Sequence, residues 1–257
     1  MPLTAFQTRL LTLLAANRSP ESFVAGGIAL NARESVRWSA DVDLFHDVED
    51  AVVRSSEADL ATLEAAGYSS SREAWTPSFR RAWITHGADG VRLEWCHDSA
   101  WRFFPIERDD LLGWRLHWFD ALTNKALAMG GRTETRDLVD IVHYASRCPL
   151  HAVIWAACSK DPGFGPLLLL SQMQRHARID PADLQAMGAS IAPQALKTQW
   201  LDLAAGADAE IQRGATAGVE VGLAFVDHSG AVGWFDDPRY RPHRATLGGA
   251  LPRIVDR

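Results

Sequence analysis

The chain has 257 residues, of which 47% are hydrophobic and 23% are charged. This balance is ordinary for a globular protein, and it excludes wholesale disorder as well as a collagen-like or coiled-coil fibre. There are 26 Lys and Arg residues against 32 Asp and Glu residues, which gives a net charge of −6. A uniformly basic nucleic-acid clamp is therefore disfavoured, whereas a local basic patch stays open.

Cysteine usage and hydropathy predict a soluble, cytoplasmic protein. The three cysteines, Cys96, Cys148 and Cys158, match no zinc or redox spacing and fit a reducing cytosol. Met1–Phe6 contains no basic leader, and the longest later apolar run, Pro166–Leu170, is far shorter than the roughly 20 residues that cross a bilayer. We therefore expect no membrane partner.

The first part of the chain, to about residue 118, predicts an α+β unit. Leucines at helical spacing over Leu10–Leu14 indicate a first helix, which turn residues at positions 17–20 end. The elements expected next are strand Ser22–Val24, helix Ile28–Arg33, strand Ala40–His46, helix Glu49–Ala66 and strands Tyr68–Trp75, Phe79–Thr85 and Val91–His97. Because only short turns separate the last three strands, we expect a mostly antiparallel meander.

The remainder of the chain predicts helices followed by a hairpin. Apolar residues recur at three- and four-residue steps in Phe119–Met129, Thr135–Ser146, Ala152–Ser159, Gly165–Ala177, Pro181–Ala186 and Pro193–Ile211. Val219–Val226 and Ala231–Trp234 flank a four-residue turn. The expected fold is thus α+β, with an α+β domain over 1–118, a helical domain over 119–213, and a short C-terminal β hairpin with a basic tail over 214–257.

The most informative stretch joins a glycine doublet to a pair of aspartates. Gly26-Gly27 lies between a predicted strand and a predicted helix, where glycine permits a positive φ and lets a polyanion approach bare backbone N–H groups. Asp41 and Asp43 lie two positions apart on a strand, so their carboxylates project from the same face. Paired carboxylates hold hard divalent cations and present them to a phosphate.

Two blocks of residues carry a resemblance to a known family. The first is Gly26-Gly27 in "GG-x-AL" together with Arg37, Ser39, Asp41 and Asp43 in "R-x-S-x-D-x-D". The second is Asn124-Lys125-Ala126-Leu127-Ala128-Met129 followed by Arg136-Asp137-Leu138-Val139-Asp140-Ile141. Over roughly residues 22–145, these blocks resemble the AbiEii/AbiGii toxin-like branch, which includes the MenT toxins, of the DNA polymerase beta-type nucleotidyltransferase superfamily.

The resemblance implies a nucleotidyltransferase-type mixed sheet in the first domain and a helical domain that completes the active site. Asp41 and Asp43 would bind Mg²⁺, which bridges the triphosphate of an NTP and activates an acceptor hydroxyl. Glu94 is the candidate for a third metal-binding carboxylate, because Leu93 and Trp95 beside it point to the opposite face. Asp98 is its competitor.

The same resemblance assigns the phosphate contacts. Ser39 and the amides of Gly26 and Gly27 would hold the β- and γ-phosphates, and Lys125 would add a positive charge. Arg37 either touches phosphate or braces the strand. Further along the chain, Asp137 is expected to be an active-site carboxylate that orients Lys125 or a substrate group. Asp140, three positions later on the same helix face, would be its neighbour.

Each of these features also has a purely structural explanation. Gly-Gly is usually a turn, Asp-x-Asp a solvated strand edge, and a single helix lysine a solvated side chain. Arg136-Asp137 also fits a surface ion pair worth under about 1 kcal/mol. Most of the ten tryptophans are expected in the core, although Trp38 beside Ser39 is placed to stack on a base. No zinc-hydrolase spacing appears among the nine histidines.

A basic tail follows residue 238. It contains five arginines and one acid, namely Arg239, Arg241, Arg244, Arg253 and Arg257 against Asp256. Such a cluster fits an RNA backbone or an acidic antitoxin, but a solvated or packed tail is the favoured explanation.

The sequence therefore predicts a Mg²⁺-dependent nucleotidyltransferase. It would move a nucleotide from an NTP to an RNA, such as a tRNA 3′ end, or to a protein hydroxyl, as the toxin of a toxin–antitoxin or phage-defence pair. Two alternatives stay open. A metal-dependent phosphatase or glycosyltransferase would also use an Asp-x-Asp strand but gains nothing from Gly26-Gly27 or Lys125. A catalytically silent nucleotide-binding regulatory module is the other, and the intact Asp41, Asp43 and Lys125 argue against it.

Overall fold

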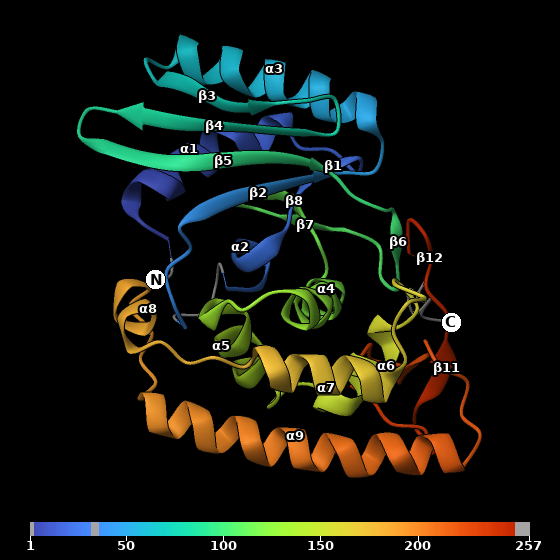
Figure 1. Ribbon diagram of the computed structural model, residues 1–257. Helices are drawn as coiled ribbons and strands as arrows, with labels where there is room; N and C mark the ends of the chain where they lie inside the picture. Colours follow the sequence, from blue (N-terminus) through green and yellow to red (C-terminus); the bar gives the residue numbers. More distant parts are fainter. Residues whose placement is uncertain (1–2, 32–35, 250–257) are drawn as a thin grey trace. The chain divides into compact units, whose positions relative to one another are not determined.

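The computed structural model describes residues 3–31 and 36–249, which divide into two compact units (Figure 1). Unit 1 consists of the described residues up to Ala100 together with Ile106–Ala121. Unit 2 consists of Trp101–Pro105 and the described residues from Leu122 onward. Unit 1 holds a mixed sheet and unit 2 is largely helical, so the predicted α+β class is confirmed.

Unit 1 is built on a seven-stranded sheet. Its elements are α1 (Ala5–Leu14), the 3-10 turn η1 (Ala15–Asn17), β1 (Ser22–Val24), α2 (Gly26–Asn31), β2 (Asp41–His46), α3 (Glu49–Ala65), β3 (Ser69–Trp75), β4 (Phe79–His86), β5 (Asp89–His97), β7 (Glu107–Asp109) and β8 (Gly113–Arg115). The strand order is β3-β4-β5-β2-β1-β8-β7. The predicted antiparallel meander is β3-β4-β5, and β5 then pairs in parallel with β2.

One face of this sheet is covered by helices because its strands alternate in polarity. In β2, Val42 and Leu44 are fully buried, whereas Asp41 and Asp43, which alternate with them, are partly exposed. Leucines of α1 and the apolar stripe of α3 pack on the buried face together with core residues of β4 and β5. Figure 1 shows α3 lying along β3 and β4. The opposite face of β2, β4 and β5 carries the polar side chains.

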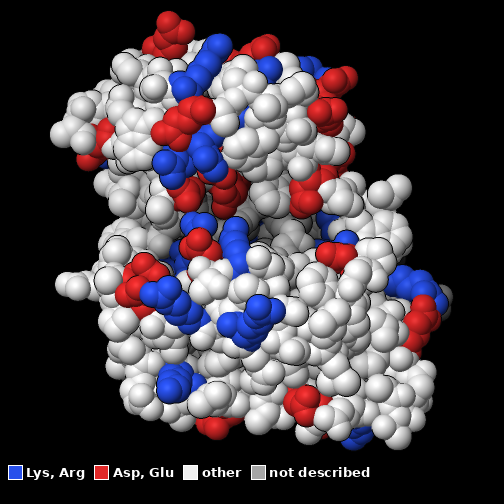
Figure 2. All heavy atoms as spheres, viewed as in Figure 1, with Lys and Arg blue, Asp and Glu red and all other residues white. Residues whose placement is uncertain are grey.

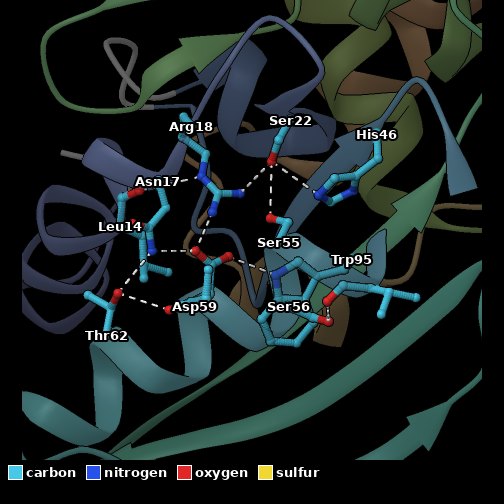
Figure 3. A network of polar contacts seen from close by, with 12 residues as sticks. Leu14, Asn17, Arg18, Ser22, His46, Ser55, Ser56, Asp59, Thr62 and Trp95 are labelled. Carbon is cyan, nitrogen blue, oxygen red and sulfur yellow. Dashed lines mark hydrogen bonds and ion pairs between the residues drawn. The ribbon is translucent and has the colours of Figure 1, made fainter. Parts of the chain in front are cut away.

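A ring of polar contacts is buried on the helix-covered face (Figure 3). Arg18 forms an ion pair with Asp59 of α3, and both side chains are almost completely buried. Trp95 of β5 donates its indole N–H to the other carboxylate oxygen of Asp59 at 2.8 Å, and Asn17 donates to the first oxygen at 2.9 Å. Arg18 also donates to the hydroxyl of Ser22 on β1 at 3.0 Å. Every charge in the ring therefore has a partner, as buried charges require.

His46 closes the ring from β2. Its Nδ1 lies 3.3 Å from the carbonyl oxygen of Cys96, which can only accept, so Nδ1 carries the proton. Its Nε2 lies 3.1 Å from the Ser22 hydroxyl. Burial lowers the pKa of His46 to about 4, helped by the charge of Arg18 and opposed by the backbone hydrogen bond to Cys96. His46 is therefore neutral at physiological pH.

Unit 2 combines helices with two small sheets. Its elements are β6 (Trp101–Arg102), α4 (Trp118–Gly131, whose first turn belongs to unit 1), α5 (Thr135–Tyr144), α6 (Leu150–Ala157), α7 (Pro166–His176), α8 (Pro181–Ala186), α9 (Pro193–Thr216), β9 (Ala224–Val226), β10 (Val232–Gly233), β11 (Arg241–His243) and β12 (Thr246–Leu247). An edge-to-face aromatic cluster around Trp234, with Trp155 and Phe225, packs β9 and β10 on α6.

Most of the predicted elements are present, with shifted ends. The hairpin is confirmed, but its first strand begins at Ala224, because Gly222 adopts a φ of +89° next to Ser159 and breaks the extended backbone. The short strands β6, β7, β8, β11 and β12 were not predicted. The end of the predicted helix Ile28–Arg33 lies outside the described residues. In the described part of the chain, no helix combines the length and apolarity needed to span a membrane.

Breaking the buried ion pair is expected to destabilise unit 1. Asp59→Asn leaves the Arg18 guanidinium buried without its counter-charge and should lower the free energy of unfolding by about 3–5 kcal/mol, measured by urea denaturation. The matched control is Asp89→Asn. Its partner is Arg9 at 3.5 Å, and both side chains are more than half exposed, so the loss should stay below about 1 kcal/mol. Equal losses in the two variants would contradict this role for the ring.

Neutral His46 is expected to make stability depend on pH. Its folded pKa lies near 4 and its ordinary value is 6.5, so below pH 6.5 the unfolded chain takes up a proton that the folded chain does not. This contribution is fully present above pH 6.5 and is lost as the pH falls towards 4, by about 1.4 kcal/mol per pH unit at most. Denaturation of the wild type and His46→Gln over this window should show a shallower slope in the variant.

Candidate active site

The two aspartates of β2 project from the same face of the sheet, as the sequence predicts. Asp41 and Asp43 alternate with the fully buried Val42 and Leu44, so both carboxylates point away from the helix-covered core. The backbone of Asp43 is fixed in addition by a hydrogen bond of 2.9 Å from the amide of Ala25 to its carbonyl oxygen. This bond joins the end of β1 to the middle of β2.

The glycine doublet lies against the side chains of this polar face. Gly26 adopts a φ of +60°, and a Cβ at this position would collide with the carboxylate of Asp43. A Cβ on Gly27 would come within 2.5 Å of the Arg37 guanidinium and 3.1 Å of the Ser39 hydroxyl. The structure thus brings both glycines, Arg37, Ser39 and Asp43 together, and glycine is required at position 26 by backbone conformation and by space.

Arg37 and Ser39 are held by the backbone around them. The guanidinium of Arg37 is largely buried and donates to the carbonyl oxygen of Trp38 at 3.0 Å. The carbonyl oxygen of Ser39 accepts a hydrogen bond of 2.6 Å from the Gln7 side chain of α1. These contacts fix the segment that leads into β2. Trp38 is exposed on it.

Glu94 lies directly beside Asp43. In the parallel pairing of β2 with β5, Asp43 is opposite Glu94 and Asp41 is opposite Arg92. Burial raises the pKa of Glu94, and the charges of Asp43 and Asp41 raise it further, while Arg81 opposes them. Asp98 lies beyond the end of β5, and its carboxylate accepts a hydrogen bond from the amide of Ser99 at 2.8 Å. The register therefore favours Glu94 over Asp98 as the third carboxylate.

Two arginines balance this cluster of acids. Arg81 of β4 donates through Nε to Glu94 at 2.7 Å. Arg92 of β5 donates through Nε to Glu73 at 3.0 Å, and its Nη1 lies 3.7 Å from Asp41. Sequence reasoning missed Arg81 and Arg92. Only the pairing of β4 with β5 and of β5 with β2 places them here, and no local motif signals that pairing.

Asp41, Asp43 and Glu94 fit a divalent cation by their chemistry. They offer only carboxylate oxygens, the ligands that Mg²⁺ prefers, and burial together with their mutual repulsion raises the pKa of Glu94. Within residues 3–31 and 36–249, however, no three His, Cys, Asp or Glu side chains are arranged so that they could hold a metal as they stand. The side chains would have to turn towards a cation, and Arg81 would then share Glu94 with it.

Unit 2 brings together the second group of predicted residues. Lys125 of α4 donates to Asp137 of α5 at 2.6 Å, and its Nζ lies 3.3 Å from the carboxylate of Asp140. Both aspartates are fully buried. Burial acts to raise the pKa of Asp137, but Lys125 and Arg132 outweigh it and hold that pKa below its ordinary value. Asp137 is thus no surface partner of Arg136, and Arg132 is a contact that the sequence analysis did not include.

The basic tail is largely neutralised where it is described. Arg239 pairs with Asp237 at 2.6 Å, and Arg244 pairs with Glu220. Arg253 and Arg257 lie outside the described residues. Figure 2 shows basic and acidic side chains next to one another over the face in view, without a continuous field of either sign. The charge pattern of this face therefore gives no support to a broad RNA-binding surface.

Comparison with known proteins supports the fold. No protein-family model and no curated protein matches the sequence. Three solved structures do match in fold. MenT4, a nucleotidyltransferase toxin from Mycobacterium tuberculosis, has a TM-score of 0.58 at 18% identity, covering 81% of this chain and 84% of its own. A proposed nucleotidyltransferase from Helicobacter pylori has a TM-score of 0.52 at 15% identity, covering 81% of this chain and 95% of its own.

The third structure, JHP933 from Helicobacter pylori, has a TM-score of 0.50 at 14% identity, covering 82% of this chain and 94% of its own. Each match extends over most of both chains. The chain therefore has the fold of nucleotidyltransferases, and the fold neighbours are consistent with the MenT-like branch that the motifs resemble.

The contact between Gly26 and Asp43 predicts a coupled effect on stability. Gly26→Ala should cost about 1–3 kcal/mol more than Gly87→Ala, because the added methyl group collides with the Asp43 carboxylate. Gly87 is the matched control: its φ is +64°, and nothing lies within 4 Å of an added Cβ. In an Asp43→Ala background the extra cost should disappear, which a double-mutant cycle by urea denaturation measures. Additive effects would contradict the contact.

Proposed function

We propose that this protein is a Mg²⁺-dependent nucleotidyltransferase that transfers a nucleotide from an NTP to a hydroxyl group of an RNA or a protein. The observation that carries the proposal is the adjacency of Asp41, Asp43 and Glu94 next to the Gly26-Gly27 turn, in a chain with a nucleotidyltransferase fold. A phosphatase or glycosyltransferase would have no use for the glycine doublet.

The proposed reaction is an in-line displacement at the α-phosphorus of the NTP. The acceptor hydroxyl gives its proton to a carboxylate of the cluster and its oxygen bonds to the α-phosphorus. The bond between the α-phosphorus and the bridging oxygen breaks, and pyrophosphate leaves. Asp41, Asp43 and Glu94 would hold Mg²⁺, which supplies charge neutralisation for the phosphates when bound. The carboxylates themselves would orient the acceptor hydroxyl.

The remaining site residues would bind the β- and γ-phosphates, which leave as pyrophosphate. The Ser39 hydroxyl and the Arg37 guanidinium border Gly27 and would bind a β- or γ-phosphate there. Lys125 would add a further positive charge, with Asp137 and Asp140 holding its ammonium in one orientation. In this role Asp137 is a positioning residue and does not touch the substrate.

The cellular role that we propose is that of a toxin. MenT4, one of the fold neighbours, is a nucleotidyltransferase toxin. By extension, the chain would act in the cytoplasm on a cellular RNA or protein and would be held in check by a cognate antitoxin.

Removing one carboxylate should abolish nucleotide transfer. With α-labelled NTPs and cellular RNA or protein as acceptors, Asp43→Asn and Glu94→Gln should each lose at least about 100-fold of the transfer rate, because the metal and the acceptor are no longer aligned. Asp98→Asn, which changes the competing acid outside the cluster, should transfer at the wild-type rate.

The outcome also separates the alternatives. Transfer that persists in Asp43→Asn and Glu94→Gln would contradict the metal-site assignment. Calorimetric binding of NTP and Mg²⁺ without transfer to any acceptor would instead indicate a catalytically silent module.

A further inference from the structure

On the face of the sheet opposite the helices, called the open face below, further side chains of β5 and β4 continue from the carboxylate cluster towards the edge of the sheet. Two rows of side chains cross the strands on this face. One row runs from Asp41 to Arg92 and Trp83, and the other runs from Asp43 to Glu94 and Arg81. The residues proposed to bind the NTP and Mg²⁺ do not include Trp83, Arg92 or Arg81.

Strand order indicates whether the NTP or the acceptor substrate binds over these rows of side chains. The Gly26-Gly27 turn follows β1, which borders β2 on one side, whereas β5 and β4 border it on the other. An in-line displacement needs the acceptor opposite the leaving pyrophosphate. If the triphosphate lies at the glycines, as the proposed function requires, the acceptor approaches over β5 and β4.

Trp83 is a flat, accessible platform on this path. Its side chain is 40% exposed although it sits in the middle of β4. Three indole atoms, Cζ2, Cε2 and Nε1, lie within 2.7–2.9 Å of the position that a Cβ on Gly90 would take. The indole therefore lies across the bare backbone of Gly90, which fixes its orientation. Two strand spacings, about 10 Å, separate it from β2, a span that one nucleotide bridges.

The two neighbouring arginines leave donors for a phosphate. Within the described chain, Arg81 and Arg92 each donate a hydrogen bond only through Nε, to Glu94 and Glu73. Their Nη groups make no hydrogen bond in the described chain, and both side chains are more than one third exposed. A guanidinium anchored through Nε presents its outer N–H groups in a fixed fork, which matches phosphate oxygens.

We propose that Trp83, Arg92 and Arg81 form the acceptor platform, on which the terminal base of a single-stranded nucleic acid stacks on Trp83 while its phosphate binds the two arginines. The terminal hydroxyl then reaches the carboxylates and gives its proton to one of them, while its oxygen bonds to the α-phosphorus of the NTP and pyrophosphate leaves. An indole beside guanidinium groups is the usual composition of a site for single-stranded nucleic acid. An unmodified protein acceptor has no phosphate for the two arginines to bind.

Equilibrium binding of a fluorescently labelled RNA oligonucleotide with a free 3′ end tests the platform on the full chain. Trp83→Ala should weaken binding by roughly 5- to 150-fold, the worth of one stacked base, and Trp83→Phe should retain most of the affinity. Arg92→Gln should weaken binding and lower the salt dependence by about one phosphate contact. Gly90→Ala keeps the indole but displaces it, so it should also weaken binding.

The controls separate this proposal from the proposed function. Trp101→Ala removes a tryptophan of similar exposure, 38%, in unit 2 and should bind RNA as the wild type does. Calorimetric binding of NTP and Mg²⁺ should be unchanged in Trp83→Ala, and urea denaturation confirms that each variant is folded. Wild-type RNA affinity in Trp83→Ala and Arg92→Gln, or transfer only to protein at an unchanged rate, would overturn the platform. If the wild-type protein shows no calorimetric binding of NTP and Mg²⁺, the proposed function is overturned instead.

Discussion

The parallel pairing of β2 with β5 decides where every carboxylate of unit 1 lies. It sets Asp43 opposite Glu94 on one face of the sheet and Leu44 opposite Trp95 on the other. Because side chains alternate along a strand, a slip of one residue would move Glu94 into the core and expose Trp95. The buried polar ring on the helix-covered face also opposes such a slip, because the slip would break its hydrogen bonds. The ring passes from Trp95 through Asp59, Arg18, Ser22 and His46 back to the carbonyl of Cys96.

Charge is balanced differently in the core and on the open face. Asp59 and Asp137 are fully buried and pair with arginine or lysine in fixed contacts, so each holds two elements of its unit together. Asp41, Asp43 and Glu94 stay partly exposed. The arginines beside them are also partly exposed, and among the described residues each is hydrogen-bonded only through its Nε. A cation or a phosphate can join this second group at low cost, whereas desolvated pairs such as Arg18 and Asp59 tolerate no new partner.

Separation along the chain explains which residues could be identified from the sequence. Gly26, Gly27, Ser39, Asp41 and Asp43 fall within one short segment, so their spacing on a strand and a turn already predicts a common face. Lys125 and Asp137 are twelve positions apart on two consecutive helices, and both belong to the second block of motif residues. By contrast, Arg81 and Arg92 owe their positions to strand pairing, and Arg18 and Asp59 meet across 41 residues. Such contacts leave no local periodicity.

Local sequence pattern was therefore sufficient to predict the α+β class, most of the helices, the glycine turn and the aspartate strand. These features depend on alternation, helical spacing and backbone freedom within a few residues. It failed for short strands such as β7 and β8, because three residues carry no measurable period. Tertiary structure alone decided that Glu94 rather than Asp98 stands beside Asp43, and that Arg81, Arg92 and Trp83 share its face. Sheet order and register bring these residues together, and both follow from packing of the whole unit.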